Sequence, residues 1–166
     1  MNKTTKIGLI VLIVAIIIIV AVFGVIKFVK SVDSKEAISV EKFKSVMEGK
    51  EFLVLDAKQS QFASVNYIKS ANIAAKKDRS YQLEFYELTS DSDAISFYNN
   101  NLNIFKSYYT NGSSEANVNT KNTSKYTLNT SDKYRVLSRI GNTVLYVSVD
   151  AKYKDDLNSI IKDLGY

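Results

Sequence analysis

Two arginines and a lysine form the strongest candidate binding site in the sequence. Arg135 and Arg139 lie four residues apart in a segment, Tyr134–Ile140, that is typical of a β-strand, so their side chains share one face of it. Lys133 directly precedes this segment. Together the three cations could bind a carboxylate or a phosphate, because a guanidinium donates paired N–H bonds to such anions. A solvated outer face of a sheet explains the same residues without a ligand.

Three aspartates near the C-terminal end have the chemistry of a metal site but not its spacing. Asp150, Asp155 and Asp156 could offer oxygen ligands to Ca²⁺ or Mg²⁺. They lack the glycine and the ligand spacing of a calcium loop. Acids at the start of a helix, stabilised by the helix dipole, are the favoured interpretation. We therefore predict no metal site and no cofactor.

Single residues elsewhere leave two alternatives open. Asp56 ends a predicted strand, where catalytic acids often lie, but no acid or base partner is visible, and a hydrogen-bonding turn residue is the favoured interpretation. Among the aromatic residues, Tyr86 and Tyr109 are the least well explained by core packing. An exposed stacking platform is the alternative for these two.

The absent residue types carry the firmest functional information. The chain has no histidine and no cysteine, which excludes Ser-His-Asp and Cys-His catalysis, histidine or thiolate metal sites, and disulfides. Its six glycines are scattered and form neither of the usual phosphate-binding patterns. We expect no catalytic residues and a protein that is not an enzyme. An enzyme that uses Ser, Lys or carboxylates without histidine is the alternative.

An apolar run near the N-terminus predicts a membrane anchor. Residues 7–26 contain no charged or polar side chain, and 20 helical residues span about 30 Å, the thickness of a bilayer core. We predict a single-pass signal anchor over residues 1–30, a linker over 31–37, and the lipid bilayer as a partner through residues 7–26. The basic, acid-free start of the chain favours a domain outside the cytoplasmic membrane.

The positive charge of the chain is concentrated in this segment. The net charge is +5, but residues 1–30 hold four lysines and no acid, which leaves 18 Lys and Arg against 17 Asp and Glu. A nucleic-acid-binding domain needs a concentrated basic patch to neutralise phosphates. We therefore expect no nucleic-acid partner.

Residues 38–166 predict one α+β domain. The expected order is α-βββ-α-βββ-α, with a mainly antiparallel sheet and helices on one face. Helices are expected after Ser39, Ser90 and Asp150, and a polar loop over Asn111–Ser124. Strands are expected over Phe52–Asp56 (buried), Val65–Lys76, Tyr81–Leu88, Lys125–Asn129, Tyr134–Ile140 and Thr143–Val149. Gly141 and Asn142 predict a two-residue type II′ hairpin turn.

Several short segments carry a family resemblance. They are EFYEL (84–88), Ala94, FYNNN (97–101), SRIGNTVLYV (138–147) and the final LGY (164–166). With them the chain resembles small single-span proteins of Gram-positive bacteria, over most of residues 38–166. The resemblance implies an anchored envelope domain and no active site.

These observations lead to two functional expectations. The first is a membrane-anchored, extracytoplasmic, non-catalytic module that binds a protein or another component of the cell envelope. The alternative is an envelope hydrolase or transferase that works without histidine.

Overall fold

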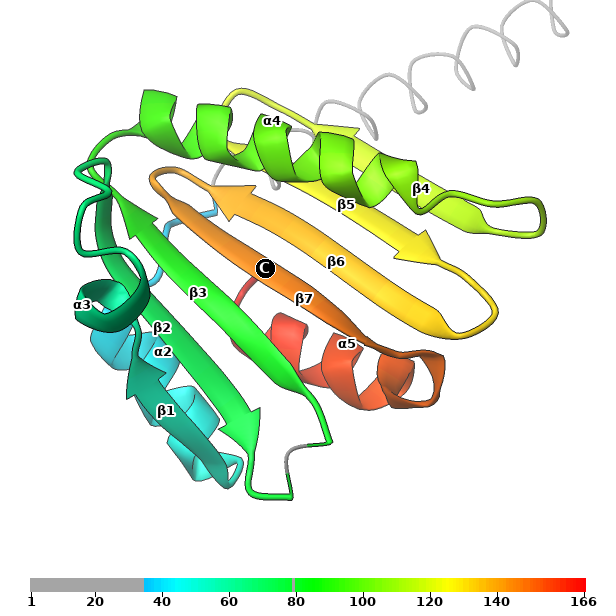
Figure 1. The fold of residues 1–166 in the computed structure, drawn as a ribbon, viewed down its shortest axis with the longest axis horizontal. Helices are drawn as coiled ribbons and strands as arrows, with labels where there is room; N and C mark the ends of the chain where they lie inside the picture. The colour runs from blue at the N-terminus through cyan, green and yellow to red at the C-terminus, as the bar shows by residue number, and fades with distance from the viewer. Residues whose placement is uncertain (1–34, 79) are drawn as a thin grey trace, which may run out of the picture. The chain divides into compact units, whose positions relative to one another are not determined.

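Seven antiparallel strands form the centre of the part of the chain that the computed structural model describes, residues 35–78 and 80–166 (Figure 1). The strands are β1 (Phe52–Asp56), β2 (Ile68–Lys76), β3 (Gln82–Leu88), β4 (Ser114–Asn119), β5 (Thr123–Asn129), β6 (Lys133–Ile140) and β7 (Thr143–Asp150). The helices are α2 (Val40–Gly49), α3 (Lys58–Gln61), α4 (Asp91–Ser107), η1 (Ala151–Tyr153) and α5 (Lys154–Asp163). The strands lie in the order β1-β2-β3-β7-β6-β5-β4.

The connection through α4 explains this order. α4 carries the chain from β3, in the middle of the sheet, to β4 at its far edge, and three hairpins then return it until β7 pairs with β3. The last hairpin turns at Gly141, whose φ of +53° suits the first position of a type II′ turn. The predicted two-residue connection is therefore confirmed.

Side-chain caps start two of the helices where the sequence predicts them. The Ser39 hydroxyl accepts a hydrogen bond from the Lys42 backbone N–H at 3.2 Å, and the Ser90 hydroxyl accepts one from the Asp93 backbone N–H at 3.1 Å. Each cap satisfies one of the N–H groups that a helix start leaves unpaired.

Helices cover both faces of the sheet, so the prediction of helices on one face is wrong. Phe43 of α2 and Leu157 of α5 belong to a core cluster on one face, while Tyr98 and Phe105 of α4 belong to a second cluster. In Figure 1, α4 crosses the near face and α2 and α5 lie behind the sheet. The central strands carry apolar side chains on both of their faces, as TVLYVSV of β7 shows. Both faces of the sheet therefore need to be covered.

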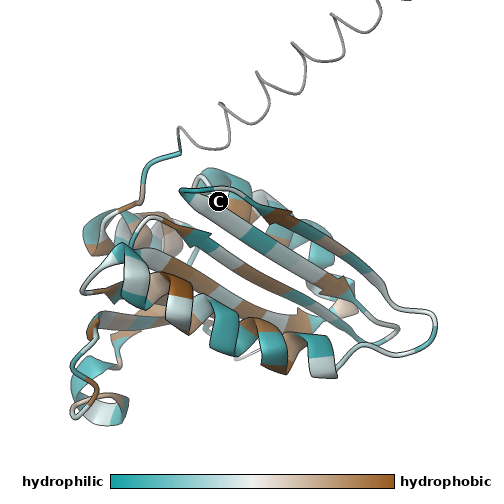
Figure 2. Ribbon diagram, turned by 90° about the horizontal axis from the view of Figure 1, so that it is seen from above, coloured by the Kyte–Doolittle hydropathy of each residue, from teal (hydrophilic) through white to brown (hydrophobic). Residues whose placement is uncertain are grey.

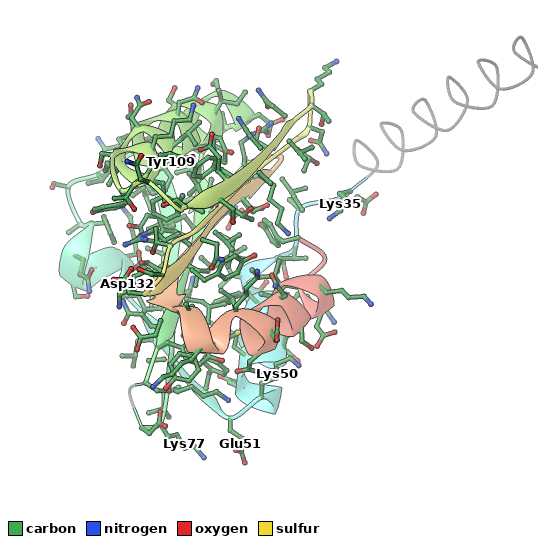
Figure 3. The ribbon with its side chains drawn as sticks, turned by 90° about the vertical axis from the view of Figure 1, so that its right-hand side faces the viewer. Lys35, Lys50, Glu51, Lys77, Tyr109 and Asp132 are labelled. Carbon is green, nitrogen blue, oxygen red and sulfur yellow. The ribbon has the colours of Figure 1, made fainter. Side chains whose placement is uncertain are left out.

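The helices on the two faces of the sheet are attached by different contacts. On the far side, the rings of Phe43 and Phe85 stack at 4.7 Å, and Lys50, at the end of α2, forms a 2.7 Å ion pair with Asp163 of α5 (Figure 3). On the near side, α4 carries both hydrophobic and hydrophilic residues (Figure 2), and Ala94, Tyr98 and Phe105 are its buried residues. Its apolar side packs on β3, β5, β6 and β7.

The number of elements also differs from the prediction. The polar segment expected as a loop, residues 111–124, contains β4, an edge strand that is exposed along its whole length and pairs with β5. Its sequence, SEANVN, lacks apolar alternation because neither of its faces is buried. The four-residue helix α3 was not expected, since it buries no side chain and leaves no periodic pattern.

The predicted fold class and the predicted membrane character also need correction at the N-terminus. No helix within residues 35–78 and 80–166 is both long enough and apolar enough to cross a membrane. The predicted span, residues 7–26, lies outside the described residues. Over the described residues, the fold class is corrected to an antiparallel seven-stranded sheet with helices on both faces.

Candidate functional site: the open part of one sheet face

Two rows of side chains cross the sheet on the face that carries α4. The ladders align Leu55, Ile73, Glu84 and Tyr146 in the first row. The second row begins with Leu53 and Ala75 and ends with Ser148 and Arg135. Residues directly opposite one another in neighbouring strands point to the same side, so each row lies on one face. With Gln82, the partner of Ala75, these nine residues are called the open face.

The described helices leave this part of the sheet uncovered. In Figure 1, α4 runs over the upper part of the near face, and no described helix crosses the lower parts of β2, β3 and β7. Phe62, which follows α3, packs edge-on against Tyr86 and closes the upper border. Leu53 and Leu55 are consequently 55% and 63% exposed.

The exposed leucines contradict the prediction of a buried strand over Phe52–Asp56. β1 is an edge strand whose Phe52 and Val54 pack on the α2 side, while Leu53 and Leu55 face outward on the other side. Single exposed apolar residues are common on monomers, but these two lie beside Ile73 and Ala75 and form a continuous patch. Apolar surface on an edge strand is an aggregation risk unless something covers it.

Arg135 is the cation of the open face. Its guanidinium carbon lies over the ring of Tyr108, 4.5 Å from the centroid, so α4 and its C-cap hold it in place. None of the ion pairs formed by the described residues includes Arg135, and its Nη1 atom is shielded from solvent without a hydrogen-bond partner. Arg135 as a whole is half-buried, and its charge acts on the Asp132 carboxylate without forming an ion pair with it.

Glu84 provides negative charge on the same face. Its Oε2 accepts a hydrogen bond from the Tyr86 hydroxyl at 2.5 Å, and its Oε1 accepts one from the Gln82 side chain at 3.3 Å. Tyr146 lies between Glu84 and Arg135 on the intervening strand. Burial, reinforced by Glu84 and opposed by Arg135, raises the pKa of Tyr146. At neutral pH, its hydroxyl is therefore a hydrogen-bond donor.

A hollow extends the open face toward the ends of β3 and β7. These strands last pair at Leu83 and Val147, and beyond that point they separate. The hollow has a volume of about 460 Å³. Apolar and polar residues both line it; they are Leu55, Ala75, Ser80, Tyr81, Gln82, Lys133, Ser148, Val149 and Asp150.

The three predicted cations have three different environments. Arg135 lies on the open face, whereas Lys133 lines the hollow and forms a 2.6 Å ion pair with Asp150. Arg139 shares a face with Arg135, as strand periodicity requires, but it is only 2% exposed. Its guanidinium donates to the backbone oxygens of Gly141, at 3.1 Å, and Lys121, at 3.2 Å. Arg139 is thus placed as a structural residue, and the candidate site is centred on Arg135.

The remaining candidates have local structural partners. The Asp56 carboxylate accepts a hydrogen bond from the Lys58 backbone N–H at 2.8 Å, as expected of a turn residue. Of the three aspartates considered as metal ligands, Asp150 pairs with Lys133, and Asp156 accepts a hydrogen bond from Tyr81. Tyr86 is buried, while Tyr109 is half exposed at the end of α4 (Figure 3).

Comparisons with known proteins add little to this geometry. No protein-family model matches the chain, and neither does any curated protein. A crystal structure of a GTP binding regulator from Thermotoga maritima is similar to it, with 12% sequence identity, 77% of this chain and 85% of that chain covered, and a TM-score of 0.46. At this level the similarity supports no conclusion about this chain. The resemblance to Gram-positive single-span proteins stays a prediction.

Proposed function

We propose that the domain is a non-catalytic binding module that holds a protein partner against the open face. One observation carries the proposal: an uncovered part of the sheet combines exposed leucines with a fixed, unpaired guanidinium. Apolar area supplies affinity, and a single well-placed charge supplies orientation. The alternative of an enzyme built around Asp56 finds no such support, because that carboxylate is exposed and serves a turn.

Substituting the exposed leucines should abolish partner binding. We expect Leu53→Ser with Leu55→Ser to reduce recovery of the partner with the full-length protein at least tenfold. Tenfold corresponds to about 1.4 kcal/mol, less than the burial of two leucines contributes. The measurement is quantitative mass spectrometry of proteins isolated with the tagged chain from cells that produce it.

A matched pair of variants controls for the loss of apolar surface. Ile95 and Ile104 are 41% and 47% exposed on α4, outside the open face. Ile95→Ser with Ile104→Ser should leave partner recovery unchanged, and both pairs should leave the unfolding temperature nearly unchanged. Equal losses from the two pairs, or a loss confined to the α4 pair, would place the interface elsewhere.

A further inference from the structure

We propose that the occupant of the open face is an extended peptide segment with an acidic residue at one position and an apolar residue two positions away. This inference rests on the proposed function, and it adds the chemistry and spacing of the partner. Three features carry it: the state of Arg135, the shape of the hollow, and the distance between the two along the strands.

Arg135 selects a carboxylate. The Tyr108 ring covers one face of the guanidinium, so its N–H donors point sideways in the plane of the group. A planar carboxylate matches that edge with two parallel hydrogen bonds. None of the ion pairs formed by the described residues uses the Arg135 guanidinium.

The hollow selects an apolar side chain with a polar backbone around it. Leu55 and Ala75 provide apolar walls, and Ser148 and Gln82 add polar groups to the lining. An extended peptide presents both kinds of group at once, since its side chain can fill the hollow while its backbone N–H and C=O groups meet the polar groups.

Strand geometry sets the distance between the two anchors. Arg135 is opposite Ser148, and Lys133, two residues earlier on β6, is opposite Asp150; Ser148, Lys133 and Asp150 all line the hollow. Two residues of a strand extend about 7 Å. Side chains at positions i and i+2 of an extended peptide point the same way with the same repeat, so both anchors can be reached together.

Selection from a random peptide library tests the proposal. Heptapeptides displayed on phage would be selected on the immobilised full-length protein and sequenced before and after selection. We expect enrichment of Asp or Glu at one position with Leu, Ile, Val or Phe two positions away. In parallel selections, Arg135→Gln should reduce the acidic enrichment at least tenfold. Ser148→Trp, which fills the hollow, should remove the apolar enrichment, and Ile104→Ser should change neither.

The outcomes separate this inference from the proposed function. Enrichment of a different motif, or an acidic preference that persists in Arg135→Gln, would overturn the inference. Absence of any enrichment would also overturn it, while a partner lost on Leu53→Ser with Leu55→Ser would still support binding at the open face. If that partner loss also failed to appear, the proposed function itself would be wrong.

Discussion

Replacing Arg139 by alanine should lower the free energy of unfolding by about 3–5 kcal/mol, because it removes several hydrogen bonds from a buried charged donor and leaves a cavity in the core. Arg139 is almost fully buried and donates to Gly141 O and Lys121 O, and also to the Ser124 hydroxyl at 3.4 Å. Its removal leaves these acceptors without a donor and creates a cavity under α4. Urea unfolding followed by circular dichroism measures the change.

Arg135→Ala is the matched control for this prediction. Arg135 lies on the same strand face, and its guanidinium lies over the Tyr108 ring, a contact that is worth about 0.5–1 kcal/mol at a partly exposed site. We expect the stability of Arg135→Ala to stay within about 1 kcal/mol of the wild type. Equal destabilisation by the two substitutions would show that the division into a structural and a binding arginine is wrong.

Raising the pH from 8 to 11 should destabilise the domain by at least about 4 kcal/mol, the share of three of its buried tyrosines. Tyr86, Tyr98 and Tyr166 are buried, and burial raises the pKa of each, that of Tyr98 to about 12. In the unfolded chain, their pKa values are about 10, so the unfolded state loses protons that the folded state keeps. Each such tyrosine contributes stability below pH 10 and loses about 1.4 kcal/mol of it by pH 11. Urea unfolding at pH 8, 10 and 11 measures this dependence.

Tyr98→Phe isolates one of these tyrosines. The Tyr98 hydroxyl is buried and has no hydrogen-bond partner among the described residues, so its removal should not lower stability at pH 8. The variant should lose about 1.4 kcal/mol less than the wild type between pH 8 and pH 11. An identical pH dependence in both proteins would contradict the assignment of a raised pKa to Tyr98.

Local sequence patterns predicted most elements because the physics that forms them is local. Ser39 and Ser90 cap helices where a hydroxyl precedes an apolar repeat, and Gly141 turns a hairpin because the turn needs a positive φ. The edge strand β4 was missed because an exposed strand needs no apolar alternation. The sequence prediction placed helices on one face only. The sequence of β7 is apolar on both faces, and this pattern indicates a second layer of helices.

The candidate site could be predicted only in part. Strand periodicity placed Arg135 and Arg139 on one face, and this is confirmed. Periodicity does not say how far a helix extends over that face, and α4 covers Arg139 but leaves Arg135 at its border. The apolar sequence of Phe52–Asp56 predicts a buried strand, but Leu53 and Leu55 are exposed, because an apolar strand has the same composition whether its second face meets a helix or a partner protein.

Site-specific photo-crosslinking in living cells tests the central claim most directly. A photoreactive phenylalanine analogue would replace Leu55 on the open face in one full-length variant and Ile104 on α4 in another. The binding account predicts a discrete crosslinked protein from position 55, absent from position 104 and lost when Arg135→Gln is added. Crosslinks of equal yield from both positions, or none from position 55 with the protein folded and the partner present, would contradict it.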